Sequence, residues 1–217
     1  MHQSFEARTM TERDRVATAE VLAKAMVIDA AYGYLIPDPE KREGALRDFF
    51  AGHLRTQLAH HFTFVGVDDG GVVATVTLRR SGLVDPSLWT TIRHGLIPFA
   101  SAHGWATVRR LFWLKGAYDE LEARLAGGEP YTHVHMMAVA PELQGRGVGS
   151  RLLAERMSWM DGRRPAILTT HLEQNVVFYE RHGFEVLSEE TLRPPGGAAY
   201  RVWSMRRPAQ ERLRRSP

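Results

Sequence analysis

A glycine-rich segment, QGRGVGSRLL at residues 144–153, has the composition of an anion-binding loop. It follows an apolar run and leads into an apolar repeat of helical spacing, so it joins a predicted strand to a predicted helix. The first N–H groups of a helix lack partners and carry the positive end of the helix dipole. Glycines beside them have no Cβ, so an anion can approach the backbone closely. The segment therefore predicts a phosphate or pyrophosphate site, with Arg146 as an added cation.

Two common phosphate-binding loops do not fit this segment. A Walker loop requires Gly-Lys-Ser/Thr, whereas Gly149 and Ser150 are adjacent here, with no lysine between them. A dinucleotide-binding fingerprint requires G-x-G-x-x-G and an acidic residue about 20 positions further on. The glycines here are spaced G-x-G-x-G, and the next predicted strand carries Thr169 and Thr170. A glycine-rich turn without a ligand remains the alternative for this segment taken alone.

Two histidines on the strand before the loop are candidates for proton transfer. His133 and His135 are two residues apart and are expected on the same face of the strand. A histidine, with an ordinary pKa of about 6.5, can accept a proton near neutral pH. His135 is therefore a candidate general base, with a purely structural role as the alternative, and His171 and Glu185 are further candidates.

Other chemistries find no support in the residues. The ten histidines contain no H-E-x-x-H spacing and the chain has no cysteine, so we expect no metal site. No G-x-S-x-G segment occurs, which leaves a serine hydrolase unsupported.

The elements that must position these residues are predicted to form one α/β domain over residues 1–208, followed by a basic tail at 209–217. Helices are expected first, then a hairpin, a helical insertion at about 83–128, and a strand–helix–strand–helix–strand run. Thr11, with Asp14 three residues on, predicts the start of the first helix. The remaining ranges are a helix from 37 to about 59, strands at 62–67, 72–78, 132–139, 166–171, 184–187 and 200–205, and helices at 148–160 and 173–182.

Bulk properties favour a cytoplasmic protein. The chain has 217 residues, a net charge of +3 and no cysteine, as expected in a reducing compartment. No run reaches the ~18 apolar residues of a membrane span. The basic tail lacks aromatic interleaving or a reader motif, so we expect a solvated tail and no nucleic-acid partner.

The glycine segment also allows a second, more specific interpretation, from its resemblance to a known motif. VAPELQGRGVGSRLL resembles the acyl-CoA-binding motif of the GNAT superfamily of N-acetyltransferases, Gln/Arg-x-x-Gly-x-Gly/Ala, through Gln144, Gly147 and Gly149. NVVFYERHGFEV resembles the second signature of the family: Asn, then Phe-Tyr, then Gly-Phe. From about residue 26 to 208 the chain is similar to the branch that contains puromycin N-acetyltransferase. That branch often carries a glutamate where this chain has Thr169, so no role is assigned to an acid at that position.

The resemblance implies a fold and an activity. The fold is a GNAT-like mixed, mostly antiparallel, curved sheet flanked by helices, with the helical insertion before the motif strand. The activity is transfer of acetyl from acetyl-CoA to an amine of a small molecule, by direct attack in a ternary complex of a monomer or homodimer. The alternatives are a binding module for acyl-CoA or a small molecule without turnover, and an acetyltransferase of protein lysines or N-termini.

The resemblance also assigns residues. Tyr179 is expected to protonate the leaving thiolate, and a backbone N–H near Val139 to polarise the thioester carbonyl. The expected cofactor-binding residues are Met137, Ala138, Val139, Gln144, Gly145, Arg146, Gly147, Val148, Gly149, Ser150, Asn175, Phe178 and Tyr179.

An apolar wall for the acceptor is expected from aromatic residues of the insertion and the N-terminal segment. Such a wall suits an amine with an apolar or aromatic body better than a polycation. Asp119, Glu120 and Glu122 offer some negative charge to a cationic acceptor, but a solvated helix face explains their spacing equally well. The expected pocket residues are Tyr32, Tyr34, Trp105, Trp113 and His133, with Phe99 and Phe112 beside them.

Overall fold

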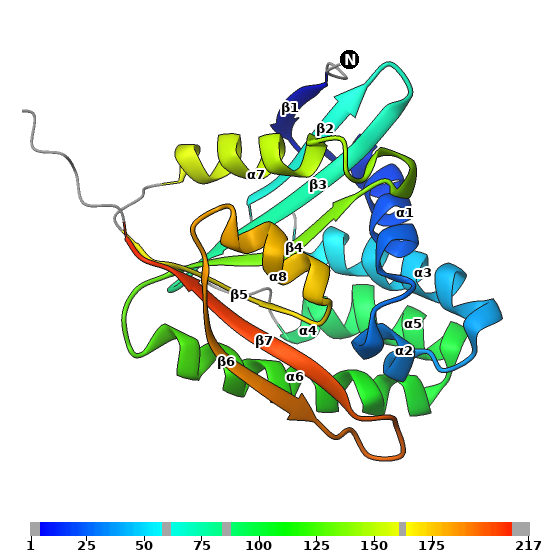
Figure 1. The fold of residues 1–217 in the computed structure, drawn as a ribbon. Coiled ribbons are helices and arrows are strands. Elements are labelled where there is room, and N and C mark those ends of the chain that lie inside the picture. The colour runs from blue at the N-terminus through cyan, green and yellow to red at the C-terminus, as the bar shows by residue number, and fades with distance from the viewer. Residues whose placement is uncertain (1–4, 58–61, 84–87, 161–163, 210–217) are drawn as a thin grey trace, which may run out of the picture.

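The fold is built on one seven-stranded sheet (Figure 1). The computed structural model describes residues 5–57, 62–83, 88–160 and 164–209. The strand order is β1-β2-β3-β4-β5-β7-β6, and every neighbouring pair is antiparallel except β4 and β5. This mixed, mostly antiparallel sheet with helices on both faces confirms the predicted α/β class. The predicted basic tail lies almost entirely outside the described residues.

The predicted strands are all present, but β6 extends to Leu192 where the prediction ended at residue 187, and one strand at the start of the chain was not predicted. The predicted hairpin is present, because β2 and β3 pair antiparallel around a tight turn. The expectation that helices come first was wrong: β1 precedes them and pairs with β2 at the sheet edge. Its four residues, EART, are too few and too polar to show an alternating pattern. The strands are β1 Glu6–Thr9, β2 Phe62–Asp68, β3 Gly71–Arg80, β4 Thr132–Val139, β5 Ala166–Thr170, β6 Glu185–Leu192 and β7 Tyr200–Arg207.

The helices fall into an N-terminal group, an insertion between β3 and β4, and two helices late in the chain. A short helix, α2, was not predicted, and the predicted end of the second helix near residue 59 lies outside the described residues. None of the helices described is long and apolar enough to cross a membrane. They are α1 Arg15–Met26, α2 Ala30–Leu35, α3 Pro39–Gln57, α4 Leu88–Thr91, α5 Ile97–His103, α6 Trp105–Ala126, α7 Val148–Trp159 and α8 Glu173–Glu180, with a π-helical turn at Ile92–Leu96.

Two apolar cores lie on the two faces of the sheet. One joins α1, α2, α3, α5 and α6 to the face that carries Met136 and Ala138 of β4. The other joins α7 and α8 to the face that carries Val134. The predicted apolar stripe of α7 is confirmed, since all its members are buried: Val148, Leu152, Leu153, Met157 and Met160.

Two irregularities of β4 shape the centre of the sheet. Thr77 lies opposite Met136 while Leu78 lies opposite Val134, so His135 is an extra residue, a β-bulge, in β4. On its other side β4 pairs with β5 only at Thr132–Ala166 and His133–Ile167. Beyond these two pairs the strands diverge, and the β5-facing backbone edge of residues 134–139 has no strand partner in the described part of the chain.

The first helical segment begins with a charged cap. The Asp14 carboxylate accepts hydrogen bonds from the Arg8 guanidinium at 2.6 and 2.7 Å and from the Thr11 backbone N–H at 2.8 Å. The hydrogen bonds from Arg8, with those from Thr11, hold the pKa of Asp14 well below its usual value. Thr11 is the N-cap of a 3-10 turn, Glu12–Asp14, that leads directly into α1, and Asp14 completes a capping box, so the predicted start of the first helical segment is confirmed.

We expect Asp14→Ala to lower the free energy of unfolding at pH 7 by about 1–2 kcal/mol, because the cap and its link to β1 are lost. Since the folded-state pKa of Asp14 is depressed, its contribution is present above the unfolded pKa of about 3.9 and disappears as the pH falls below it. Urea unfolding at pH 7 and in acid measures both effects, with Asp69→Ala in the exposed β2–β3 turn as the control. A loss that persists unchanged in acid would contradict this account.

Candidate active site

The divergence of β4 and β5 opens into a cleft of about 1530 Å³. One part is lined by β4, the glycine loop and α8, with Met137, Ala138, Val139, Gln144, Gly145, Gly147, Gly149, Ser150, Asn175, Phe178 and Tyr179. The other part is lined by α2, α3, the insertion and the ends of β4 and β5, with Tyr32, Phe49, His53, Phe99, Phe112, Tyr118, Glu122, His133, His135 and His171 among its residues. The cleft therefore joins the glycine loop to a pocket rich in aromatic and titratable side chains.

The glycine loop has the backbone geometry that its sequence predicted. Gly145 and Gly147 adopt positive φ angles of 74° and 82°, and a Cβ at either would meet no atom within 4 Å. Gly147 is the N-cap of α7, so the helix presents its unpaired first-turn N–H groups beside open space. Gly149 is needed for packing, since a Cβ there would lie 3.1 Å from the Val139 Cγ2 and 3.2 Å from the Met137 Cε.

Two residues of the predicted cofactor site, Val148 and Arg146, do not place their side chains in the cleft. The Val148 side chain is buried in the core beneath α7, because it belongs to the apolar stripe of that helix. The Arg146 side chain is exposed and does not line the cleft. Only the backbone of Val148 is placed at the helix start, and the expectation of Arg146 as a cation in the cleft has no support in this geometry.

The second signature brings α8 to the same cleft. Asn175 donates from Nδ2 to the Thr170 Oγ1 at 3.2 Å, which ties α8 to the end of β5. Tyr179 packs edge-on against Phe178 and Phe184, with ring centroids 5.1 and 5.7 Å away. Burial raises the pKa of Tyr179 above its ordinary value, so its phenol stays protonated at neutral pH.

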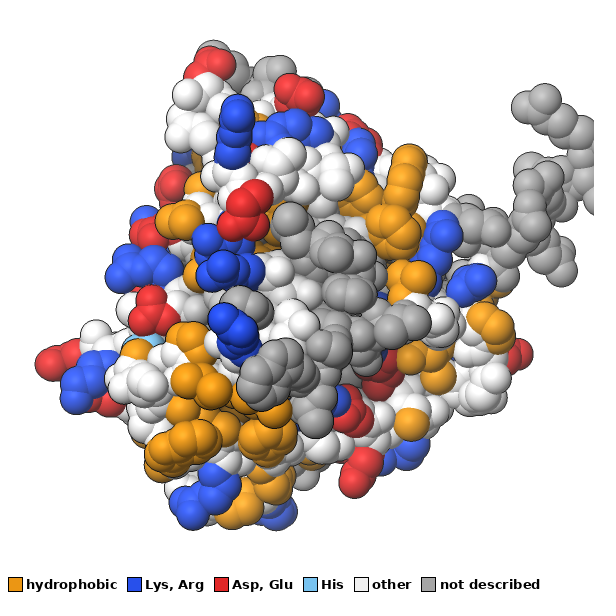
Figure 2. Space-filling view, turned by 180° about the vertical axis from the view of Figure 1, so that it is seen from behind, with side chains coloured by type: hydrophobic (Ala, Val, Ile, Leu, Met, Phe, Trp, Pro, Cys, Tyr) orange, Lys and Arg blue, Asp and Glu red, His pale blue; other side chains and the backbone are white. Residues whose placement is uncertain are grey.

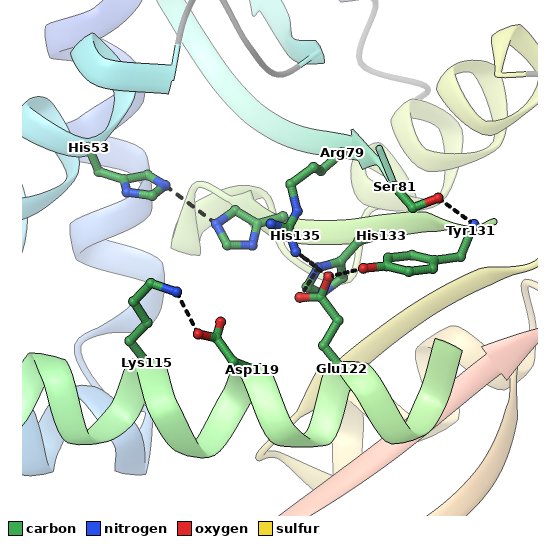
Figure 3. A network of polar contacts seen from close by, with 9 residues as sticks. All are labelled: His53, Arg79, Ser81, Lys115, Asp119, Glu122, Tyr131, His133 and His135. Atoms are coloured by element: carbon green, nitrogen blue, oxygen red, sulfur yellow. Dashed lines mark hydrogen bonds and ion pairs between the residues drawn. The ribbon is translucent and has the colours of Figure 1, made fainter. Parts of the chain in front are cut away.

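Three histidines form a row along the opposite wall (Figure 3). The bulge places His135 beside His133, with ring centroids 5.3 Å apart. The Nε2 of His135 is 3.4 Å from the Nε2 of His53, which projects from α3. His53 was not singled out from the sequence, since it is separated from His135 by 82 positions.

Glu122 of α6 anchors one end of this row. Its carboxylate accepts from the Tyr131 hydroxyl at 2.5 Å and lies 3.1 Å from the His133 Nδ1, with Arg79 as an ion-pair partner. Burial alone would raise the pKa of Glu122, but the bonds from His133 and Tyr131 and the charge of Arg79 lower it to about 2. The expectation of a solvated face is corrected for Glu122, because α6 turns this side chain toward β4.

The aromatic wall is only partly as expected. Tyr32 and His133 line the cleft, and so do Phe99 and Phe112. Three predicted members do not: Tyr34 and Trp113 pack against each other in the core, with ring centroids 5.5 Å apart, and Trp105 is 73% exposed. Hydrophobic side chains gather on part of the surface seen from behind in Figure 2, and the exposed ones of the insertion include Ile97, Trp105 and Phe112. Helical spacing alone did not reveal which face of α6 meets the sheet.

A second cluster in the cleft consists of Asp29, Tyr118 and His171, and the sequence analysis identified only His171 of these three. The His171 Nδ1 lies 2.6 Å from the Asp29 Oδ2, and its Nε2 lies 2.6 Å from the Tyr118 hydroxyl. Asp29 is the N-cap of α2, and an aspartate is typical of that position, so the sequence could have predicted the start of α2 there. No group of three or more metal-ligating side chains is found in the described ranges.

Comparisons with known proteins agree with this geometry. Residues 111–186 match the family model described as the acetyltransferase (GNAT) domain. No curated protein matches the chain. A solved structure of histone acetyltransferase HPA2 and related acetyltransferase from Corynebacterium glutamicum is similar with a TM-score of 0.66 and 20% identity, covering 97% of this chain and 99% of that one.

Two further structures of similar fold were solved with a ligand. PaiA N-acetyltransferase from Thermoplasma acidophilum, in complex with coenzyme A, has a TM-score of 0.54 and 14% identity over 94% of this chain and 99% of that one. A phosphinothricin acetyltransferase from Sinorhizobium meliloti, in complex with AcCoA, has a TM-score of 0.55 and 14% identity over 100% of this chain and 94% of that one.

The fold and the family match define the class of protein. The chain carries a GNAT acetyltransferase domain, and the sheet around that domain has the GNAT fold. The match covers residues 111–186, and two of the structures that share the fold were solved with coenzyme A or AcCoA bound. The closer likeness to the puromycin N-acetyltransferase branch stays a prediction.

We expect Glu122→Gln to lower the free energy of unfolding at pH 7 by about 2–3 kcal/mol, because Arg79 and His133 lose a charged acceptor inside the fold. The pKa of Glu122 is depressed, so its contribution is present above the unfolded value of about 4.3 and is lost as the pH falls toward about 2. Urea unfolding over this range measures the change, with Glu120→Gln on the exposed face of α6 as the control. Equal effects of the two substitutions would contradict the role given to Glu122.

Proposed function

We propose that this protein transfers acetyl from acetyl-CoA to the amine of a small molecule with an apolar body, by direct attack in a ternary complex. The observation that carries the proposal is the single cleft that joins the glycine loop and the free edge of β4 to an aromatic pocket. The donor and the acceptor can therefore meet at one point, where β4 and β5 diverge.

The residues present fit acetyl-CoA. The open space beside Gly145 and Gly147 and the start of α7 suit the pyrophosphate. The edge of β4 at residues 137–139 has no strand partner among the described residues, although the Gln144 side chain donates to the Val139 carbonyl at 3.1 Å. This edge suits the amide groups of pantetheine, which can pair with it as an added strand would. In this proposal a backbone N–H near Val139 donates to the thioester carbonyl. When bound, acetyl-CoA supplies an activated acetyl group and a thiolate as leaving group.

Tyr179 is proposed as the proton donor to the leaving sulfur. It lines the cleft on the α8 side, and its raised pKa keeps the hydroxyl protonated until it is needed. A tyrosine hydroxyl positioned in this way acts as a general acid.

His135 is proposed as a base on the opposite wall. A protonated primary amine loses two protons in becoming an amide, one before it can attack and one from the nitrogen after the bond to carbon forms. His135 lines the cleft, and the bulge in β4 turns it toward His53 and His133. We assign it the second proton, because β4 is also the strand along which the thioester would lie.

The acceptor end of the cleft favours an apolar body. Its walls carry Tyr32, Phe49, Phe99 and Phe112, and two of its acids are paired with cations, Asp119 with Lys115 and Glu122 with Arg79. Paired carboxylates offer little to a polycationic aminoglycoside. A phosphinothricin acetyltransferase shares the fold, and it too is named for a small acceptor.

We expect Gly147→Glu to abolish measurable binding of CoA, because a charged side chain would occupy the space proposed for the pyrophosphate. Isothermal titration calorimetry measures the affinity. Gly82→Glu is the matched control: it has the same φ of 82° and open space, and it lies outside the cleft. Binding that survives in Gly147→Glu would refute the site.

We expect the wild-type protein to release thiol from acetyl-CoA in the presence of amines, with an aromatic or apolar amine preferred over an aminoglycoside. Tyr179→Phe should lower kcat about 10²–10⁴-fold with little change in CoA affinity, since only the proton donor is lost. Thiol release by the wild type with no amine in a broad panel, but with peptides, would favour a protein acetyltransferase. No release with either would favour a binding module.

A further inference from the structure

A chain of hydrogen bonds crosses the cleft where four distant segments meet. Asp29 comes from the turn before α2, Tyr118 from α6, His171 from the end of β5 and Tyr200 from β7. The bonds join Asp29 to His171 at 2.6 Å, His171 to Tyr118 at 2.6 Å, and Tyr118 to Tyr200 at 3.2 Å. Asp29, Tyr118 and His171 line the cleft. The first two bonds are short, so the positions of these groups are closely fixed.

The directions of these bonds follow from the donors available. The Asp29 carboxylate accepts from the Ala31 N–H at 2.9 Å through Oδ1, and from His171 through Oδ2. The imidazole proton of neutral His171 therefore sits on Nδ1, and Nε2 carries the lone pair. The Tyr118 hydroxyl must then donate to Nε2. Burial raises the pKa of Tyr118, which keeps this phenol protonated in the resting state.

The charge balance of the group sets it apart from the rest of the cleft. Asp29 has an ion-pair partner only in His171 among the described residues, whereas Asp119 and Glu122 are each paired with a lysine or an arginine. The other titratable groups that interact here are Tyr32, Tyr118 and Tyr200, and burial raises the pKa of each of these three phenols. The Tyr34 phenol also acts on Tyr200. With His171 neutral, the group carries one buried negative charge. Uptake of a proton by His171 would neutralise it as an ion pair.

We propose that Tyr118, His171 and Asp29 form a relay that takes the first proton from the acceptor ammonium in the reaction proposed above. The ammonium N–H bond breaks and its proton goes to the Tyr118 oxygen, while the Tyr118 proton moves to the His171 Nε2. The electron pair stays on nitrogen, giving a neutral amine able to attack. The products are a neutral phenol and an imidazolium held against the Asp29 carboxylate. His171 later returns the proton to solvent.

In this scheme Tyr118 is the catalytic residue that touches the acceptor, and Asp29 is a positioning residue that fixes the tautomer of His171. The relay is distinct from His135, which lies on the other diverging strand and takes the second proton. Two separate acceptors fit the two protons that the nitrogen must lose.

The test compares two acceptors in wild type and Tyr118→Phe. Benzylamine is an ammonium at pH 7 and needs the relay, whereas aniline is already neutral. We expect Tyr118→Phe to lower kcat/KM for benzylamine at pH 7 by about 100-fold or more, and for aniline by less than about 3-fold. The benzylamine defect should shrink about tenfold for each unit of rising pH, as solvent deprotonates the amine instead. His171→Gln should reproduce this pattern, because glutamine keeps hydrogen bonds but takes no proton.

Tyr34→Phe is the matched control, since it removes a hydroxyl from a core tyrosine outside the cleft. CoA binding by calorimetry checks that each variant is folded; if Tyr118→Phe does not fold, His171→Gln decides. Equal losses for both acceptors, or a loss that does not change with pH, would overturn the relay while leaving acetyl transfer intact. A wild type that acetylates no amine would instead overturn the proposed function, and the relay with it.

Discussion

The structure depends on one incomplete pairing. β4 and β5 are parallel neighbours joined at only two residue pairs, and from Val134 onward they part. A sheet that separates at its centre leaves backbone N–H and C=O groups without partners, which is costly unless water or a ligand satisfies them. Each strand is held in place from its other side, β4 by β3 over almost its whole length and β5 by β7. The divergence can therefore be maintained without loss of the sheet.

Helix α7 begins at the opening between these two strands. Its apolar stripe fixes it to the face that carries Val134, and Gly149 lets its first turn approach β4 closely. The N-terminus of the helix is thereby brought to the mouth of the opening, beside the glycines that keep the backbone accessible. The positive end of the α7 dipole and the β4 edge that lacks a strand partner thus lie next to each other in the same cleft. This suits a ligand with an anionic end and an amide-bearing arm.

The sequence predicted those parts of the site that are local in the chain. The glycine loop, the strand before it and the signature of α8 lie within about fifty residues of one another, and the resemblance to the GNAT motifs indicated that they belong to one site. The acceptor end could not be predicted in the same way, because its contacts join residues far apart. Asp29 reaches His171 across 142 positions, and His53 reaches His135 across 82. For the same reason, composition could not show that Trp113 packs in the core while Glu122 faces the cleft.

Helix α6 links the two diverging strands at the acceptor end. Tyr118 and Glu122 are four residues apart, so they project from the same side of the helix. Glu122 contacts His133 on β4, and Tyr118 contacts His171 at the end of β5. One helix of the insertion therefore holds a titratable group against each side of the opening, four positions apart along a rigid element. Figure 1 shows α6 running along the lower edge of the fold, below the strands that separate. The insertion thus does more than cover the pocket, because its side chains contact both strands. A change in the length or tilt of α6 would move Tyr118 and Glu122 at once, which couples the shape of the acceptor pocket to the chemistry proposed inside it.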